Sequence, residues 1–400
     1  MPQIVPPEYT RQILFSLTAE GHSAYLVGGC VRDMLMGKTP QDWDICTSAL
    51  PQEVLDIFPN AVPTGLKHGT VTVYCGGKSA EVTTFRTDGA YPDHRRPESV
   101  TFVSDIESDL SRRDFTMNAI ALSSDGSYKD PFGGEADINA KIIRCVGEPV
   151  TRFTEDALRM LRALRFASRL GFEIEKNTYA AIGSCAYLCS SLAPERIADE
   201  LKKILMSGRT EILDEVMKLG LISHLTDGAG KPGAPFAAVA DMPENASYRW
   251  TGFAVMLNKY GYVSSARGFL SSLKLDTATL RYCGQTEKIL SLLPTANAAC
   301  MKRLLAEYGE DCVSCAAAVK KVLGTDCENE LFRVLDSGEC HSLKSLAVCG
   351  DDLKSLGYSG KRLGAVLKLL LEHVIEHPGD NDRGILLKLA ENTEVNDGIL

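Results

Sequence analysis

The chain has 400 residues, of which 44% are hydrophobic and 24% charged, and its formal net charge is −9. This composition is that of an ordinary globular protein with enough length for two to four modules. No apolar run approaches the length of a membrane span, and the first residues, MPQIVPPEYT, lack the pattern of a signal peptide. These features argue against a membrane-spanning or secreted protein.

The 13 cysteines are scattered along the chain. Cys312 and Cys315 form a C-x-x-C pair, but no second pair stands at zinc-site spacing, so we expect buried thiols of a helical core. An odd number of cysteines without a secretion signal fits a reducing compartment, and we therefore expect a cytoplasmic protein.

The first elements follow from apolar spacing and glycine positions. Tyr9–Glu20 has helical periodicity, and Ala24–Val27 is a short apolar run that predicts a buried strand entering a turn at Gly28–Gly29. Val31–Met36 then predicts a brief helix. Gly37 should end that helix, because glycine adopts the left-handed cap without a Cβ clash.

A second strand is predicted to carry Asp42 and Asp44. Side chains two positions apart on a strand point the same way, so both carboxylates should face one spot. Such a pair suits a hard divalent cation, and backbone N–H groups at a Gly-Gly turn suit phosphate. The same D-x-D spacing at Asp380 and Asp382 shows that a solvated turn is the alternative.

Two further strands are expected after a short helix at Glu53–Phe58. Thr70–Tyr74 and Ala80–Phe85 both alternate between apolar and polar residues. The second places Glu81 on a face where it could be the third carboxylate of a two-metal site. An exposed strand glutamate is the alternative.

The segment Arg86–Val100 is polar and punctuated by glycine and proline, which predicts a long mobile loop of the kind that closes over a site. A disordered surface hairpin is the alternative. Asp109–Leu122 follows and supplies Arg113 and Asp114 at the entry of a predicted apolar helix. Arg113 suits a phosphate, and Asp114 could cap the helix.

A basic stripe lies in this acidic chain, because Lys141–Leu170 holds seven basic residues and three acidic ones. Thr151–Leu170 is predicted to be one helix, capped by Thr154. Its buried face comprises Met160, Ala163, Leu164 and Ala167, and another face carries Asp156, Arg159, Arg162 and Arg165. A solvated basic face is the alternative to a binding function.

The arrangement of a strand, Gly28–Gly29, Arg32 on a one-turn helix and the D-x-D pair ten residues later resembles the nucleotidyltransferase head of the polymerase-beta-like superfamily. Within it, the chain is similar to the bacterial (class II) tRNA nucleotidyltransferase and poly(A) polymerase family, which includes enzymes that add C-C-A. The pattern EDxxRxxRxxRF at Glu155–Phe166 resembles the family's base-reading helix, and Ser191–Leu205 resembles the motif that follows it.

The resemblance implies an α+β fold, with a small mixed sheet and helices in the head, followed by an all-helical neck, body and tail. The expected domains are a head at 1–140, a neck at 141–210, a body at 211–300 and a tail at 301–400 that contacts tRNA. Thr226–Ser247, rich in Gly, Pro and Ala, is the expected connector. In the tail, Gly360, Lys361 and Arg362 suit a backbone phosphate.

The resemblance also implies a reaction. CTP or ATP would bind at Gly28, Gly29, Arg32 and Arg113, and Asp156, Arg159, Arg162 and Arg165 would complete the nucleotide site. Mg²⁺ on Asp42 and Asp44, with Glu81 as the third catalytic carboxylate, would activate the 3′ end of tRNA and neutralise the pyrophosphate. The sequence carries no indication of oligomeric state.

A physical argument connects Asp156 and Arg159 with base choice. Aspartate only accepts hydrogen bonds and arginine only donates them. Cytosine and adenine each present an amino donor beside a ring-nitrogen acceptor, whereas uracil and guanine present a carbonyl beside an N–H. The pair should therefore select CTP and ATP without a nucleic-acid template.

Three other functions remain open at this point. A poly(A) polymerase shares the head motifs but usually has a long basic extension, whereas this chain ends in acidic residues and Thr64–Val71 resembles the tRNA-specific branch. Enzymes that add only C-C typically lack the loop at Arg86–Val100, and an enzyme that adds only A is still possible. A catalytically dead RNA-binding module would need no trio of carboxylates.

Overall fold

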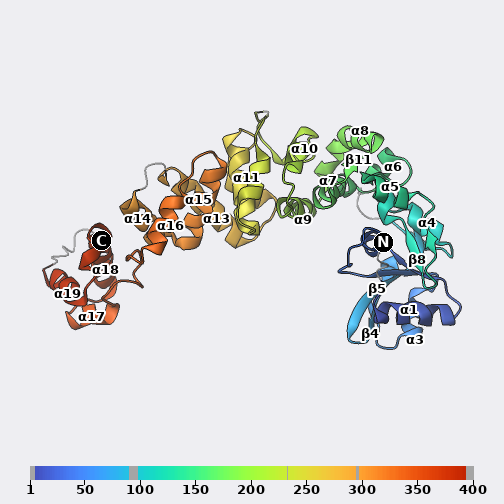
Figure 1. The fold of residues 1–400 in the computed structure, drawn as a ribbon, viewed down its shortest axis with the longest axis horizontal. Helices are drawn as coiled ribbons and strands as arrows, with labels where there is room; N and C mark the ends of the chain where they lie inside the picture. Colours follow the sequence, from blue (N-terminus) through green and yellow to red (C-terminus); the bar gives the residue numbers. More distant parts are fainter. Residues whose placement is uncertain (1–4, 90–97, 232, 294–296, 393–400) are drawn as a thin grey trace. The chain divides into compact units, whose positions relative to one another are not determined.

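The computed structural model describes residues 5–89, 98–231, 233–293 and 297–392. The chain forms two compact units, Met1–Leu225 and Thr226–Leu400. The first contains the sheet, and the described part of the second is built from helices, so the predicted α+β class is confirmed (Figure 1). The division begins at the predicted connector Thr226–Ser247, and the finer four-part division stays a prediction.

The sheet of the first unit has seven strands in the order β3-β4-β5-β2-β1-β8-β9. All neighbours are antiparallel except β2 and β5, which are parallel. At one edge, β3 contains Pro63 and its register shifts between Val62 and Gly65; at the other, β9 has two residues. The strands are β1 (Ala24–Val27), β2 (Asp44–Thr47), β3 (Val62–Gly65), β4 (Thr70–Cys75), β5 (Lys78–Thr84), β8 (Ala121–Ser123) and β9 (Tyr128–Lys129).

Short helices pack around this sheet. Helices α1 (Glu8–Ala19) and α3 (Pro51–Ile57) contact each other and the strands, as the blue part of Figure 1 shows. Helix α2 (Gly29–Leu35) ends as predicted, because Gly37 adopts φ +71° beyond it. We call the sheet and the short elements around it, all within the first unit, the sheet unit. It also contains α4 (Ile106–Ser111), α5 (Gly134–Ala140) and the 3₁₀ turns η1 (Leu66–His68) and η2 (Thr116–Asn118).

Two predictions for residues 86–122 meet different outcomes. The predicted apolar helix after Asp109 is wrong: this segment forms η2 and then strand β8, which pairs with β1 in the core. The ends of the predicted loop Arg86–Val100 pair as the antiparallel strands β6 (Arg86–Asp88) and β7 (Val100–Phe102). Its tip, residues 90–97, lies outside the described residues, so the mobile loop stays a prediction.

The remainder of the first unit is mainly helical. The predicted single helix Thr151–Leu170 is wrong, because Asp156 adopts an extended conformation (φ −138°, ψ 103°) that divides it into α6 and α7. The Asp156 carboxylate accepts from Leu158 N at 3.1 Å and so starts α7, while the Thr154 hydroxyl bonds to Val150 O inside α6. The elements are β10 (Ile142–Ile143), α6 (Pro149–Glu155), α7 (Leu158–Leu170), β11 (Glu173–Ile174), α8 (Lys176–Cys185), η3 (Ala186–Ser191), α9 (Pro194–Leu205), α10 (Ile212–Lys218) and η4 (Ser223–Leu225).

The predicted apolar face of α7 is confirmed, since Met160, Ala163, Leu164 and Ala167 are all buried. Helix α7 packs against α9 and contacts α6 and α10. One side of α7 is therefore fixed by helices, which leaves its polar side chains in defined positions.

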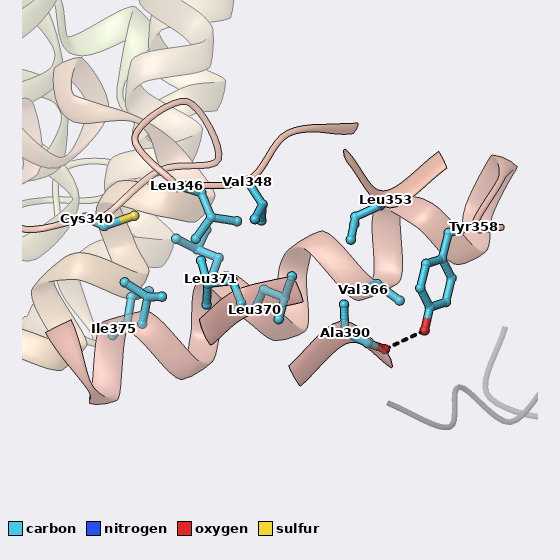
Figure 2. Close-up of a cluster of buried hydrophobic side chains, with 12 residues drawn as sticks. Cys340, Leu346, Val348, Leu353, Tyr358, Val366, Leu370, Leu371, Ile375 and Ala390 are labelled. Atoms are coloured by element: carbon cyan, nitrogen blue, oxygen red, sulfur yellow. Dashed lines mark hydrogen bonds between the residues drawn. The ribbon is translucent and has the colours of Figure 1, made fainter. Parts of the chain in front are cut away.

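In the second unit, one hydrophobic cluster joins α13 through α16, and a second joins the last helices. Figure 2 shows the latter, in which the Tyr358 hydroxyl donates to Ala390 O at 2.7 Å. The elements are η5 (Phe236–Asp241), α11 (Ala246–Lys259), α12 (Ala266–Ser272), α13 (Thr277–Leu290), α14 (Ala298–Tyr308), α15 (Glu310–Val322), α16 (Glu328–Asp336), α17 (Gly350–Ser355), α18 (Gly360–Glu376), η7 (Pro378–Asp380) and α19 (Arg383–Glu391).

Cys312 and Cys315 are both buried on α15, as expected for core thiols. Within the described ranges, no helix is long and apolar enough to cross a membrane.

A chain of hydrogen bonds around Asp114 fastens α7 to the sheet unit. Its carboxylate accepts from the Phe115 N–H, from Asn118 Nδ2 at 3.1 Å, and from Arg162 Nε and Nη2 at 2.8 and 2.5 Å. Asn118 in turn accepts from Arg32 Nη1 at 2.8 Å. Burial alone would raise the pKa of Asp114, but the Arg162 charge and these hydrogen bonds hold it at about 2.

This pKa makes stability depend on pH. Because the folded-state pKa is depressed, ionised Asp114 stabilises the fold above about pH 4, and that contribution is lost as the pH falls toward 2. We expect Asp114→Asn to lower the free energy of unfolding by about 2 kcal/mol at pH 7. The deficit should shrink steadily between pH 5 and pH 2.

The two tryptophans allow this measurement on one unit, because Trp43 lies in the first and Trp250 in the second. Urea unfolding of the full chain would be followed by Trp43 fluorescence in a Trp250→Phe background. In an Arg162→Gln background, the effect of Asp114→Asn should be smaller because its partner is already gone. A deficit that is constant with pH would contradict this account.

Candidate active site

Three carboxylates meet where β2 begins. Asp44 is the first residue of β2 and is in register with Glu81 on the parallel strand β5. Asp42 precedes the strand, so the prediction that both aspartates lie on it is wrong for Asp42. The three side chains nevertheless line one cavity of about 440 Å³. The parallel pairing of β2 and β5 therefore brings together residues 37 positions apart.

The electrostatics of Asp44 reflect this crowding. The pKa of Asp44 is raised, first because surrounding protein displaces water from the carboxylate. The Arg113 charge opposes the shift, while Glu81 and Asp42 raise the pKa further. A cation bound here would relieve the repulsion between the carboxylates.

The donor set fits a divalent cation that takes only part of its ligands from the protein. In the described part of the chain, no group of three or more Asp, Glu, His or Cys residues could hold a metal by itself. Magnesium commonly uses one or two protein carboxylates and completes its octahedron with water and substrate phosphates. Asp42 and Asp44 can supply that protein share.

The turn at Gly28 brings the backbone close to these groups. Gly28 adopts φ +76°, and a Cβ there would lie 3.2 Å from Arg113 Nη1 and 3.8 Å from Asp44 Oδ2. Only glycine combines this conformation with so close an approach. The turn, Arg113 and Asp44 thus converge at one place.

The Arg113 side chain is fixed by the buried carboxylate of Asp109. Its Nη2 donates to Asp109 Oδ2 at 3.0 Å and to Cys46 Sγ at 3.2 Å. Asp109 also accepts from Arg112 and from the Arg86 N–H at the root of the β6–β7 hairpin. Burial alone would raise the pKa of Asp109, but Arg113 and Arg112 hold it below its usual value.

The role of Asp109 and the hydrogen bonds of Asn118 were not predicted from the sequence. A signal for Asp109 was available, because aspartate four residues before Arg113 is at helical pairing distance. For Asn118, which joins Arg32 to Asp114, the sequence held no comparable signal.

Arg32 lies between the two parts of the site. It bonds to Asp33 Oδ1 through Nε and Nη2, and to Asn118 through Nη1. Its guanidinium carbon is 5.3 Å from the ring centre of Phe166 on α7. Arg32 and Phe166 line one cavity with Asp42 and Asp44, so this contact places α7 beside the aspartates.

The predicted base-reading residues lie around the start of α7. Asp156 accepts from Arg196 Nη2 at 3.0 Å, an ion pair that fixes the carboxylate against α9. Arg159 is buried and donates to Glu155 Oε2 and to the carbonyls of Arg152 and Arg112. Because the helix breaks at Asp156, the predicted i, i+3 relation along one helix face does not hold for this pair.

The two later arginines have separate partners. Arg162 binds Asp114, whereas Arg165 is buried and forms an ion pair with Glu200 of α9 at 2.8 Å. Arg165 also lies over the Phe166 ring at 4.1 Å. Arg162 is therefore on the side of the sheet unit and Arg165 is against α9. A nucleotide-binding role for Arg165 stays a prediction.

Comparison with known proteins places the whole chain in one group. Residues 24–144 match the poly A polymerase head domain, 171–229 a probable RNA- and SrmB-binding site of polymerase A, and 243–390 a putative tRNA nucleotidyltransferase domain 2. The CCA-adding enzyme of Limosilactobacillus fermentum is 36% identical over 406 residues, covering 97% of this chain and 98% of the relative. That of Geobacillus thermodenitrificans is 44% identical over 296 residues, 72% of each protein.

A solved structure agrees with these sequence matches. The crystal structure of the Bacillus stearothermophilus CCA-adding enzyme in complex with CTP has a TM-score of 0.80 and 34% identity, covering 97% of this chain and 98% of that one. This chain thus matches these enzymes over almost its whole length. The matched region includes the three carboxylates, the turn at Gly28 and the arginines of α7. The chain belongs to the CCA-adding enzyme family of tRNA nucleotidyltransferases.

Proposed function

We propose that this chain adds C, C and A to the 3′ end of tRNA from CTP and ATP, without a template and with release of pyrophosphate. The observation that carries the proposal is the register of Asp44 with Glu81, next to a turn where Gly28 approaches Arg113. This arrangement puts carboxylates for a metal beside donors for a triphosphate. The 13 free cysteines support a cytoplasmic location.

In the proposed reaction, the terminal 3′-hydroxyl oxygen of tRNA forms a bond to the α-phosphorus, and the bond between that phosphorus and the β-bridging oxygen breaks. Pyrophosphate leaves with the electron pair. Mg²⁺ held by Asp42 and Asp44 would supply charge to activate the hydroxyl and stabilise the leaving group. Glu81 orients the hydroxyl and passes its proton to water, while Arg32 and Arg113 position the phosphates.

The contacts of Arg159 support a role in base selection. Three interactions fix its guanidinium, while its Nε–H and one Nη2–H have no partner among the described residues. Asp156 is fixed by Arg196 in the same way. A rigid donor and a rigid acceptor would favour the pairing edges of cytosine and adenine over those of uracil and guanine.

A decisive assay uses two acceptors, tRNA that lacks the whole C-C-A and tRNA that ends in C-C, each with labelled CTP or ATP. An enzyme that adds the whole C-C-A extends both acceptors. An enzyme that adds only A would extend only the second, and a poly(A) polymerase would add long runs of A to either. The full-length matches to CCA-adding enzymes favour the first outcome.

We expect Asp42→Ala and Asp44→Ala each to reduce nucleotide incorporation by about a hundredfold or more, because each removes a metal ligand. The affinity for tRNA should stay nearly unchanged, since the basic residues of α7 and the tail are intact. The measurements are single-turnover incorporation and equilibrium tRNA binding. Asp56→Ala removes an exposed carboxylate on α3 and serves as control. Incorporation above about a tenth of the parent rate would count against the metal role.

We expect Arg159→Ala to lower kcat/KM for CTP and ATP and to narrow their advantage over UTP and GTP. Each hydrogen bond to a charged group contributes about 1.5–3 kcal/mol, so loss of two could cost several powers of ten in selectivity. Arg159→Lys keeps the charge but loses the fork, and it should also lose selectivity.

Arg162→Ala is the comparison variant, because Arg162 binds Asp114 and lies three residues farther along α7. It should weaken nucleotide use while the ranking of the four bases stays the same. If Arg159→Ala instead lowered kcat/KM for all four nucleotides by one common factor, Arg159 would be a general contact and not a selector.

A further inference from the structure

Two cavities, not one, adjoin the aspartates. Both are lined by Gln41, Asp42 and Asp44, and their volumes are similar, about 440 and 420 Å³. We name them by their other residues. The glutamate-side pocket adds Tyr9, Trp43, Thr72, Ser79, Ala80 and Glu81, and the arginine-side pocket adds Gly29, Arg32, Asp33, Lys38, Thr39, Phe166, Arg169 and Leu170.

The two pockets differ in charge. The lining of the glutamate-side pocket contains three carboxylates, those of Asp42, Asp44 and Glu81, and, among the described residues, no lysine or arginine. The arginine-side pocket has three cations, Arg32, Lys38 and Arg169, which balance the three aspartates in its lining. Phosphate groups with several negative charges should enter the second pocket and avoid the first.

Lys38 is placed by the end of α2. Gly37 N donates to Met34 O at 2.9 Å and Lys38 N to Asp33 O at 2.8 Å, the two bonds of a Schellman motif. Gly37 adopts a left-handed conformation that ends the helix, and the next residue, Lys38, lines the arginine-side pocket. Its side chain is exposed and forms no ion pair or hydrogen bond with another described residue.

Arg169 reaches the same pocket from the last turn of α7. Arg162, Phe166 and Arg169 stand at i, i+4 and i+7, so they follow one face of the helix. That face leads from Asp114 past Arg32 to the arginine-side pocket. Like Lys38, Arg169 is exposed and has no ion-pair partner in the described ranges, whereas Arg159, Arg162 and Arg165 all have one.

The length of α7 matches this arrangement. Arg159 and Arg169 are separated by about 15 Å along the helix axis at 1.5 Å per residue. A nucleotide whose base lies at Arg159 would therefore extend its phosphates toward Arg169 and the aspartates. Two unpaired cations at that end are what the terminal phosphates need.

We propose that Lys38 and Arg169 bind the two terminal phosphates of the incoming CTP or ATP in the arginine-side pocket, which then holds the pyrophosphate as it leaves. The glutamate-side pocket receives the terminal ribose of tRNA. The two substrates thus approach Asp42 and Asp44 from opposite sides. This inference rests on the proposed function and adds two phosphate-binding residues to its site.

The test compares ligands that differ only in phosphate number. Equilibrium binding of CTP and CMP to the full chain would be measured for the parent protein, Lys38→Gln and Arg169→Gln. Each variant should weaken CTP binding by about tenfold and leave CMP binding unchanged, because a charged hydrogen bond to a phosphate is lost. Pyrophosphate binding should weaken by a similar factor.

Two further variants serve as controls. Arg169→Lys keeps the positive charge and should retain most of the CTP affinity. Lys129→Gln removes an exposed lysine on β9, outside both pockets, and should change neither ligand. Equal weakening of CTP and CMP by Lys38→Gln or Arg169→Gln would overturn the assignment, as would unchanged CTP binding.

The other pocket is tested by filling it. Ser79 is exposed on β5, so Ser79→Tyr adds bulk that a strand accepts. We expect this variant to bind CTP normally and to incorporate C at least about tenfold more slowly, because the ribose is displaced. Weakened CTP binding with normal incorporation would reverse the two pockets and refute the proposal. Failure of the proposed function would be separate, since the parent protein would then extend no tRNA.

Discussion

The carboxylate of Asp114 is the group on which the arrangement of this site depends. It is buried, its charge is paired with that of Arg162 from α7, and Asn118 from η2 donates a hydrogen bond to it. If either partner were removed, the other would lose this ion pair and its two hydrogen bonds. Helix α7, which carries the arginines proposed to bind nucleotide, is thereby fixed against the part of the same unit that carries the proposed catalytic carboxylates.

Secondary structure and charge act together around this point. The parallel pairing of β2 with β5, in a sheet that is otherwise antiparallel, sets Asp44 beside Glu81. Nearby, Asp109 accepts hydrogen bonds from Arg112, from Arg113 and from the Arg86 N–H at the root of the β6–β7 hairpin. A displacement of that hairpin would therefore shift Asp109 and with it Arg113, which lies next to Gly28 and Asp44.

Local patterns in the sequence predict the parts of this site that depend on local physics. The apolar run Ala24–Val27 is a strand, and Gly37 ends the helix that begins at Gly29, because these outcomes follow from burial and from backbone sterics. Alternation along Ala80–Phe85 predicted the strand that carries Glu81, whereas the register of Glu81 with Asp44 depends on the pairing of β5 with β2. The α+β class was implied by the family resemblance.

Other features depend on contacts distant in sequence, so they could not be predicted this way. The periodicity of Thr151–Leu170 is helical throughout, yet Asp156 leaves the helix to bind Arg196 and to cap α7. The apolar segment before Leu122 fits a buried strand as well as a helix, and pairing with β1 decides between them. Asn118 has no chemical signature until Arg32 and Asp114 are placed on either side of it.

The edges of the sheet have a consequence for how the protein behaves at high concentration. An exposed strand edge offers N–H and C=O groups on which another chain can add, which promotes aggregation. Here Pro63 removes one N–H donor from β3, the register of β3 is irregular, and β9 has two residues. Neither edge presents a long, regular strand with which a strand of a second copy could pair. The sheet can therefore remain open at both edges with little tendency to form fibres.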